Sequence, residues 1–249
     1  MRIGVLGASS IIGQAVVDRL RSMGHDVQIW GRQQSGGEDL HLLFDLDAPT
    51  PLTGPTCESA VLLSWIGDPR TPEVMQRNKS SYQFLADELQ RSSTFPVFVS
   101  TATSSQTSRS VHARAKFATE QLFDGWGAIV RPGRILFRDG RIAGRAARKS
   151  WLMSQIGSVI RTDLKIPTVQ IDAVAAKIVT LAISRTPGTW DLQDELVLVG
   201  SHRKFAPLVP RRIIHYFVLG VAFVIFRQKS NILDRWYALI DAQRLEQDN

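Results

Sequence analysis

Short apolar runs alternate with amphipathic segments along the first two-thirds of the chain. Because the strands of a buried parallel sheet are apolar on both faces, we expect a strand at each run. The predicted strands lie at residues 2–6, 26–30, 40–44, 60–65, 95–100 and 127–131. Strands that alternate with helices pair in parallel through right-handed crossovers. The pattern therefore predicts an α/β fold, a doubly wound parallel sheet with helices on both faces.

Two of the intervening helices have recognisable ends. Between the first two predicted strands, apolar residues recur at helical spacing, and Gly24 follows them as a stop signal. A second helix is expected to begin near residue 71. There, Thr71 can cap the helix, Pro72 fits its first turn and Glu73 favours its positive end.

The alternation of strands and helices becomes less regular after residue 132. Residues 133–151 are rich in arginine and read as a loop, whereas residues 165–170 and 188–192 read as strands. Residues 172–183 have the pattern of a helix, which we expect Asp172 to cap.

The composition is that of a soluble globular protein, since 44% of the 249 residues are hydrophobic and 21% are charged. The single cysteine, Cys57, excludes an intramolecular disulfide and favours a reducing compartment. The first residues enter a predicted strand at once, so we expect no signal peptide. Together these features predict a cytoplasmic protein.

The net charge of +7 is concentrated in the second half of the chain. Residues 1–130 carry 11 Lys+Arg and 13 Asp+Glu, whereas residues 131–249 carry 19 and 10. This excess indicates an anionic partner, such as a phosphorylated substrate or an acidic membrane surface, or else only a basic solvated surface. The basic half shows no nucleic-acid recognition motif and no regular aromatic interleaving, so we expect no nucleic-acid partner.

The sequence GVLGASSIIGQAVVDRL, at residues 4–20, joins the first predicted strand to the first helix. Gly7 and Gly13 bracket a turn whose backbone amides, with the helix N-terminus, can hold a pyrophosphate. The alternative is a tight turn with no ligand. The strand before the turn and the amphipathic helix after it favour a dinucleotide site.

This spacing resembles that of the extended and atypical short-chain dehydrogenase/reductases, which include epimerase/dehydratase-like proteins. Their loop reads G-x-x-G-x-x-G, and Ser10 stands here for the middle glycine. The resemblance covers roughly residues 1–195 and implies a Rossmann fold. It extends to the aspartate that meets the adenine amine, here Asp45, and to Pro132 near the nicotinamide. The residues to which it assigns cofactor binding are Gly7, Ser9, Ser10, Ile11, Ile12, Gly13, Arg32, Asp45, Trp65, Ile66, Gly67, Asn78, Lys116 and Pro132.

The end of the second strand bears on the choice of cofactor. Family members that prefer NAD have an acidic residue there, which bonds both ribose hydroxyls. Here the position is Gly31, and Arg32 follows it. A guanidinium binds a 2′-phosphate through paired charge-assisted bonds, so we expect NADP(H), with NAD as the alternative. Arg32 could also be a solvated loop residue.

The resemblance also assigns a catalytic group. In the family a tyrosine is the general acid/base, a lysine four residues later holds the nicotinamide ribose, and a serine or threonine orients the substrate oxygen. The matching residues are Thr101, His112 in place of the tyrosine, and Lys116. On a helix His112 and Lys116 share one face, and imidazole suits proton transfer near neutral pH. Glu120 continues that face and could be only a solvated helix residue.

Two readings of His112 remain open. It could be the acid/base of a working enzyme, or a polar residue left where catalysis was lost. The first makes the protein an NADP(H)-dependent oxidoreductase or epimerase acting on a sugar-nucleotide-like or other anionic carbonyl or hydroxyl substrate. The second makes it a non-catalytic NAD(P)-binding redox sensor. We expect no metal site in either case.

The C-terminal part supplies the remaining expectations. We expect a dinucleotide-binding core at residues 1–132 and a smaller substrate-side region at residues 133–249, partly interleaved with the core. Residues 213–226 form a nearly unbroken apolar run with basic flanks, too short to span a bilayer. It is expected to be a helix that packs on the protein or in a homodimer, or else one that touches a membrane surface. The candidate residues for an anionic substrate are Arg134, Arg138, Arg141 and Arg145.

Overall fold

The architecture follows from a computed structural model. The residues that the structure describes are 1–32, 40–53, 56–66, 71–136, 165–193 and 195–198. The apolar run at residues 213–226, residue Gly67, and three of the four candidate arginines, Arg138, Arg141 and Arg145, lie outside them.

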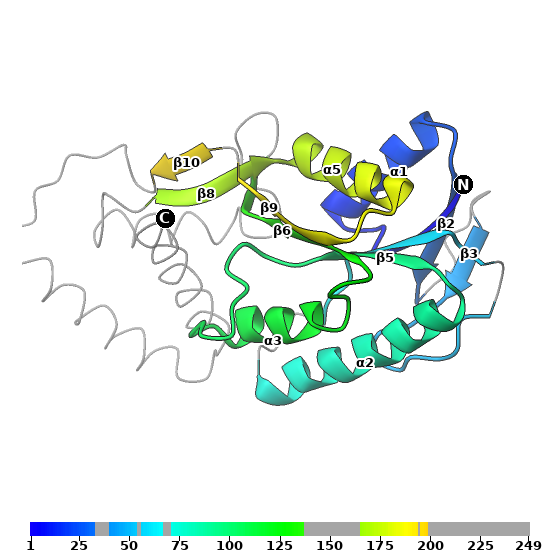
Figure 1. Ribbon diagram of the computed structural model, residues 1–249, viewed down its shortest axis with the longest axis horizontal. Helices are drawn as coiled ribbons and strands as arrows, with labels where there is room; N and C mark the ends of the chain where they lie inside the picture. The colour runs from blue at the N-terminus through cyan, green and yellow to red at the C-terminus, as the bar shows by residue number, and fades with distance from the viewer. Residues whose placement is uncertain (33–39, 54–55, 67–70, 137–164, 194, 199–249) are drawn as a thin grey trace, which may run out of the picture.

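A seven-stranded sheet forms the centre of the fold (Figure 1). In spatial order its strands are β3 (Leu40–Leu43), β2 (Asp26–Gly31), β1 (Arg2–Leu6), β4 (Ser59–Leu62), β5 (Phe95–Val99), β6 (Ala128–Pro132) and β9 (Gly188–Leu192). Every pairing between these neighbours is parallel. The predicted doubly wound α/β fold is confirmed.

Successive strands are added to the sheet first on one side of β1 and then on the other. From β1 the chain moves outward to β2 and β3, then returns to β4 on the other side of β1 and continues to β5 and β6. Loops that leave the carboxyl ends of β1 and β4 therefore diverge, and in open α/β sheets such a crevice is where ligands bind.

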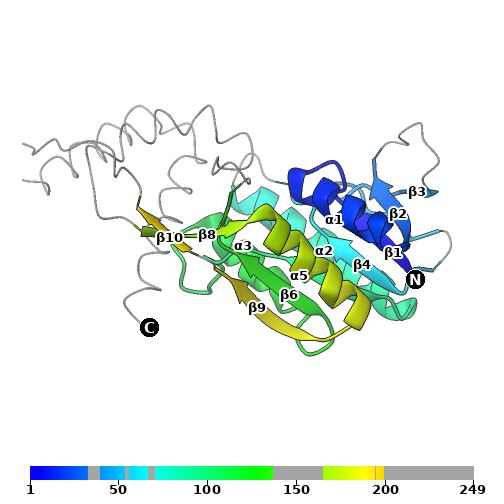
Figure 2. The same cartoon turned by 90° about the horizontal axis from the view of Figure 1, so that it is seen from above.

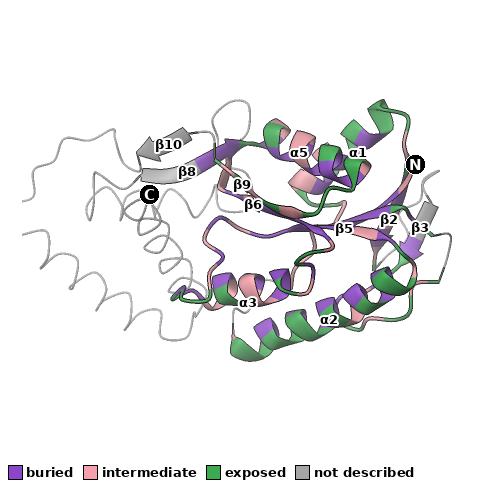
Figure 3. Cartoon of the chain, in the orientation of Figure 1, coloured by how far each residue is buried: buried purple, intermediate pink, exposed green. Residues whose placement is uncertain are grey.

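Helices cover both faces of the sheet (Figures 1 and 2). Helices α1 (Ile11–Ser22) and α5 (Ile171–Ser184) pack together on one face, and α2 (Pro72–Arg91) and α3 (Val111–Glu120) on the other. Alternate strand residues supply the two cores: Val5 and Val97 belong to the cluster under α1 and α5, whereas Leu6 and Phe98 belong to the cluster under α2. The outer faces of α1 and α2 are exposed (Figure 3).

The predicted helix ends are confirmed in two cases and wrong in one. Thr71 caps α2, since its hydroxyl accepts a hydrogen bond from the amide of Val74. Gly24 follows the last turn of α1 with a φ of +76°, which an L side chain rarely adopts. Asp172, however, does not cap α5: the cap position is Gln170, and Asp172 lies within the first turn, where its carboxylate still meets the positive helix end.

A second, three-stranded sheet follows the main one. Strand β7 (Arg134–Leu136) pairs in parallel with β8 (Lys165–Gln170), which pairs in antiparallel fashion with β10 (Glu195–Leu198). The prediction of a loop from residue 133 onward is therefore wrong for residues 134–136. Three residues are too few to show a periodic pattern, and their partner strand lies some thirty residues later in the sequence.

In the part of the chain that the structure describes, no helix combines the length and the apolar character needed to cross a membrane.

The turn from β1 into α1 is unusually close. Gly7 has a φ of +94°, and a Cβ at Gly13 would lie 2.3 Å from the carbonyl oxygen of Gly7. A side chain at Gly13 would push the helix away from the strand, and one at Gly7 would meet the backbone of Leu63 and Ser64 after β4. The two glycines therefore bring the N-terminus of α1 directly to the carboxyl end of β1.

We expect Gly13→Ala to lower the free energy of unfolding by about 1–3 kcal/mol, because the added methyl group has no room against the carbonyl of Gly7. Urea denaturation measures the change. Gly31→Ala is the control, since a Cβ there meets no described atom within 4 Å, and it should stay within about 0.5 kcal/mol of the parent. Equal losses in the two variants would show that the close turn carries no particular constraint.

Candidate functional site

The N-terminus of α1 offers two open backbone donors. Ser10 caps the helix: its hydroxyl accepts from the amide of Gly13 at 3.0 Å, and its carbonyl accepts from Gln14 at 2.8 Å. The amides of Ile11 and Ile12 have no acceptor among the described residues. An anion at this end of the helix can accept from both and gains from the helix dipole. The neighbouring Ser9 is exposed.

Two further predicted residues follow strands that end at the same edge. Arg32 comes directly after β2 and is exposed. Asp45 comes shortly after β3, and its carboxylate accepts from the amide of Asp47 at 3.0 Å, which forms a turn. One carboxylate oxygen supports this turn, so the other can accept from a ligand.

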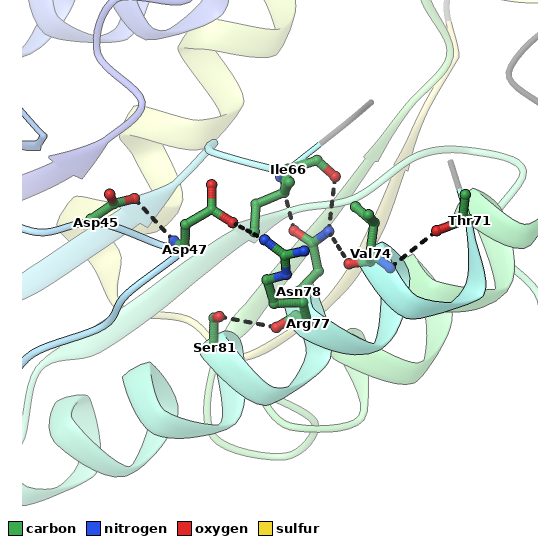
Figure 4. A network of polar contacts seen from close by, with 8 residues as sticks. All are labelled: Asp45, Asp47, Ile66, Thr71, Val74, Arg77, Asn78 and Ser81. Atoms are coloured by element: carbon green, nitrogen blue, oxygen red, sulfur yellow. Dashed lines mark hydrogen bonds and ion pairs between the residues drawn. The ribbon is translucent and has the colours of Figure 1, made fainter. Parts of the chain in front are cut away.

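Asn78 holds the segment that follows β4 (Figure 4). Its amide oxygen accepts from Ile66 N at 2.9 Å, and its amide nitrogen donates to Ile66 O at 2.8 Å and to Val74 O at 3.0 Å. Both donors and the acceptor are used, and Asn78 is fully buried. Asn78 therefore positions the loop backbone and is not itself open to a ligand.

The same loop is held a second time, on the other side of Trp65. The buried hydroxyl of Tyr82 donates to the carbonyl of Ser64, and the Trp65 indole stacks on the Tyr82 ring with centroids 5.6 Å apart and planes at 29°. The amides of Leu63 and Ser64 both donate to the carbonyl of Leu6 at the end of β1. These contacts fix the backbone around Trp65.

Lys116 is enclosed between α3 and the sheet. Its side chain is only 5% exposed, and Nζ donates to the carbonyl oxygen of Val99 at 2.8 Å. Nζ also lies 4.1 Å from the centroid of the Trp65 ring and 4.7 Å from that of Phe98. Burial lowers the pKa of Lys116 to about 7, and the charge of Glu120 opposes this shift.

His112 lies one helical turn before Lys116 and contacts the same indole. Its ring meets Trp65 edge to face, with centroids 5.6 Å apart and planes at 86°. Ser110 caps α3 through a bond from Ala113 N, which fixes the start of the helix two residues before His112. The structure thus brings together His112, Lys116 and Trp65.

Thr101 and Pro132 lie at the ends of neighbouring strands. Thr101 follows β5, is half-buried, and its hydroxyl lies 3.4 Å from that of Thr103, a weak contact that leaves it able to bond a substrate oxygen. Pro132 ends β6, and its carbonyl accepts from Ala102 at 3.0 Å. Thr101 is therefore at the carboxyl edge of the sheet, just after the strand whose Val99 carbonyl binds Lys116.

Glu120 is not the solvated helix residue that the sequence allowed. Glu120 is fully buried, and its carboxylate forms an ion pair with Arg131 at 2.5 Å and accepts from the Ser104 hydroxyl, also at 2.5 Å. The pairing raises the pKa of Arg131. Neither Arg131 nor Ser104 was expected at the site. The available signal was the spacing, because Glu120 follows Lys116 by four residues and shares its inward face.

Two buried polar atoms beside this cluster lack hydrogen-bond partners in the described part of the chain: the Trp65 indole nitrogen and the Ser100 hydroxyl. Ser100 directly precedes Thr101, and sequence reasoning had not selected it.

Of the candidate arginines, Arg134 is described and half-buried at the start of β7, and burial lowers its pKa.

By sequence, the chain matches neither a family model nor a curated protein. By structure, it resembles UDP-N-acetylglucosamine 4-epimerase from Bacillus cereus, at 13% identity over 80% of this chain and 77% of that one, with a TM-score of 0.61. A short-chain dehydrogenase/reductase superfamily protein from Agrobacterium tumefaciens, solved with bound NAD, has 14% identity, coverages of 81% and 80%, and a TM-score of 0.62. A human epimerase family protein with NADPH has 19% identity, coverages of 78% and 74%, and a TM-score of 0.56. The chain therefore has the Rossmann-like α/β fold of these proteins.

The enclosure of Lys116 predicts a pH dependence of stability. The amine of an unfolded chain titrates near 10.4, whereas in the folded state the Lys116 pKa is lowered to about 7. Between these values the unfolded state binds more protons, so Lys116 makes the free energy of unfolding rise with pH from about 7 towards 10. In Lys116→Met this contribution should disappear, as measured by urea denaturation at a series of pH values.

The matched control is Lys79→Met, at an exposed position on α2, which should keep the pH dependence of the parent. If the difference between the parent and Lys116→Met is the same at every pH, the amine is not enclosed as described.

Proposed function

We propose that this protein binds NADP(H) across the carboxyl edge of its parallel sheet. It then acts as an oxidoreductase or epimerase on a sugar-nucleotide-like or other anionic carbonyl or hydroxyl compound. The observation that carries the proposal is the open N-terminus of α1: the amides of Ile11 and Ile12 have no acceptor among the described residues, and α1 directly follows β1, beside which the strand order reverses. The NADPH bound to the human neighbour and the UDP-glucose bound to an epimerase from Thermotoga maritima support the ligand classes.

The described residues fit a dinucleotide along this edge. The close turn at Gly7 and Gly13 leaves helix amides for a pyrophosphate, Asp45 keeps a carboxylate oxygen for the adenine amine, and Arg32 is exposed after β2 for a 2′-phosphate. Bound NADP(H) would supply or accept the hydride. In this assignment His112 stands where the family has its tyrosine, and Pro132 lies beside the nicotinamide.

The chain's own residues would then manage the proton. His112 would give a proton to the substrate oxygen, or take one from it, and the Thr101 hydroxyl would hold that oxygen by a hydrogen bond. Lys116 would hold the nicotinamide ribose. Its amine lies under the Trp65 indole, so this last contact requires the indole to turn aside. Residues 133–249 would supply the substrate side, with Arg134 beside the end of β6 as a candidate for an anionic group.

The enclosure of Lys116 favours a second candidate function, a non-catalytic NAD(P)-binding redox sensor. A lysine that is 5% exposed and bonded to Val99 O does not meet a ligand unless the site rearranges. If oxidised and reduced cofactor move Trp65 differently, the rearrangement itself becomes the signal. The two functions share the cofactor site and differ in whether a substrate reacts.

Arg32 should decide the cofactor preference. Arg32→Ala is expected to weaken NADPH binding about tenfold to a hundredfold and to leave NADH binding nearly unchanged, because a lost charge-assisted phosphate contact costs about 1.5–3 kcal/mol. Calorimetric titration with both cofactors measures this. Arg19→Ala, at an exposed position in the last turn of α1, is the control and should bind both as the parent does. If Arg32→Ala prefers NADPH over NADH as strongly as the parent does, Arg32 does not set the cofactor preference.

His112 should separate chemistry from binding. Once a screen of nucleotide sugars and simple carbonyls has found a compound that oxidises NADPH, His112→Ala should reduce turnover about 10²–10⁴-fold, because the imidazole acts only in the chemical step. NADPH affinity should stay within about twofold. His25→Ala, in the connection between α1 and β2, is the control and should retain turnover.

Full activity of His112→Ala would show that the proton passes elsewhere. If no compound reacts, yet NADP and NADPH produce different conformations, the sensor is the function.

A further inference from the structure

We propose that Trp65 is a positioning residue of this site: its indole holds the amine of Lys116 against β5 and fixes the imidazole of His112 one helical turn away. The inference deepens the proposed function, since it concerns the same two residues. It starts from one fact of geometry. A single ring from the loop after β4 contacts both side chains, the lysine with its face and the histidine in an edge-to-face arrangement.

The indole is itself held from two sides. On one side, the carbonyl of Ser64 accepts a hydrogen bond from Tyr82, and the indole stacks on the Tyr82 ring. On the other side, both backbone groups of Ile66 are bonded to the Asn78 side chain. These contacts restrain both the backbone and the ring plane. In the ligand-free protein, Trp65 can therefore position the two side chains that lie against it.

The other described groups around Lys116 are one hydrogen-bond acceptor, a second aromatic ring and titratable groups on α2 and α3. From α3, Glu120 acts on the amine only by its charge, because its carboxylate is bonded to Arg131 of β6 and to Ser104. From α2, the phenol of Tyr82 is neutral, since burial raises its pKa. From β5, only the Val99 carbonyl and the Phe98 ring reach Nζ. Among the residues that the structure describes, the remaining titratable neighbour is His112 on the same helix.

Opposite effects are expected from two substitutions at Trp65. Leucine keeps the amine away from water but removes the π face that favours the charged form, so the Lys116 pKa should fall. Alanine opens the amine to water, which stabilises the ammonium, so the pKa should rise. Phenylalanine retains a π face and much of the volume, and it should come close to the parent. A side chain that merely fills space would not give opposite signs.

The test uses the ligand-free protein with labelled lysine and histidine, titrated by NMR. The Lys116 resonance is assigned from Lys116→Arg. In the parent, Lys116 should titrate near pH 7. The midpoint should fall by about 1 pH unit in Trp65→Leu, rise towards 10 in Trp65→Ala and stay within about half a unit in Trp65→Phe. The His112 ring protons should lose the ring-current shift of the indole in Trp65→Leu and recover part of it in Trp65→Phe.

The control is Trp126→Leu. Trp126 is also half-buried and packs against Phe123, but its contacts are away from Lys116, so both resonances should stay as in the parent. If the Lys116 midpoint and the His112 shifts are unchanged in both Trp65→Leu and Trp65→Ala, or if Lys116 of the parent titrates near 10, the proposal is overturned. Because no cofactor is present, a failure to bind NADPH would refute the proposed function and leave this result intact.

Discussion

Helix α3 carries both His112 and Lys116, and its position on the sheet depends on the carboxylate of Glu120. This group is fully buried, and it joins three separate parts of the chain: α3 itself, Arg131 on β6, and Ser104 in the connection after β5. A buried carboxylate is tolerated only when it is paired and its remaining lone pairs are bonded, so both partners, Arg131 and Ser104, are obligatory. The ion pair therefore fixes the helix, the end of β6 and the loop beyond Thr101 relative to one another.

The two charged side chains on the inner face of α3 have different surroundings. Glu120 meets a guanidinium, which stays protonated at any physiological pH and favours the carboxylate. Lys116 meets a neutral carbonyl and two aromatic rings, which favour an ammonium much less than a carboxylate would. The helix thus places a permanent charge and a titratable charge one turn apart. Since Glu120 is already engaged, its charge reaches Lys116 only through space, and the amine can lose its proton near neutral pH.

The sequence predicted the sheet better than the site because the two depend on different information. Strands β1, β2, β5 and β6 follow from local apolar runs, and the caps at Thr71 and Gly24 follow from local chemistry. The short strand β7 depends on pairing with β8, and the burial of Glu120 depends on Arg131, eleven residues later. The contact of Trp65 with Lys116 joins residues about fifty positions apart, on separate elements. The resemblance to a family assigned Trp65 and Lys116 to cofactor binding, but it could not show that the indole covers the amine.

The contact of the Trp65 indole with the Lys116 amine bears on both candidate functions. The proposed enzyme would need Lys116 within reach of the cofactor, whereas the structure encloses its amine under the Trp65 indole, and the backbone on each side of Trp65 is hydrogen-bonded. A cofactor that reaches Lys116 by displacing the indole would break the contact between the amine and the ring and also disturb the edge contact with His112, because the same ring makes both. Binding at the lysine and the orientation of the histidine are therefore linked through one side chain. In an enzyme this link would couple cofactor binding to the readiness of the acid/base, and in a sensor it would convert the same binding step into a change of shape.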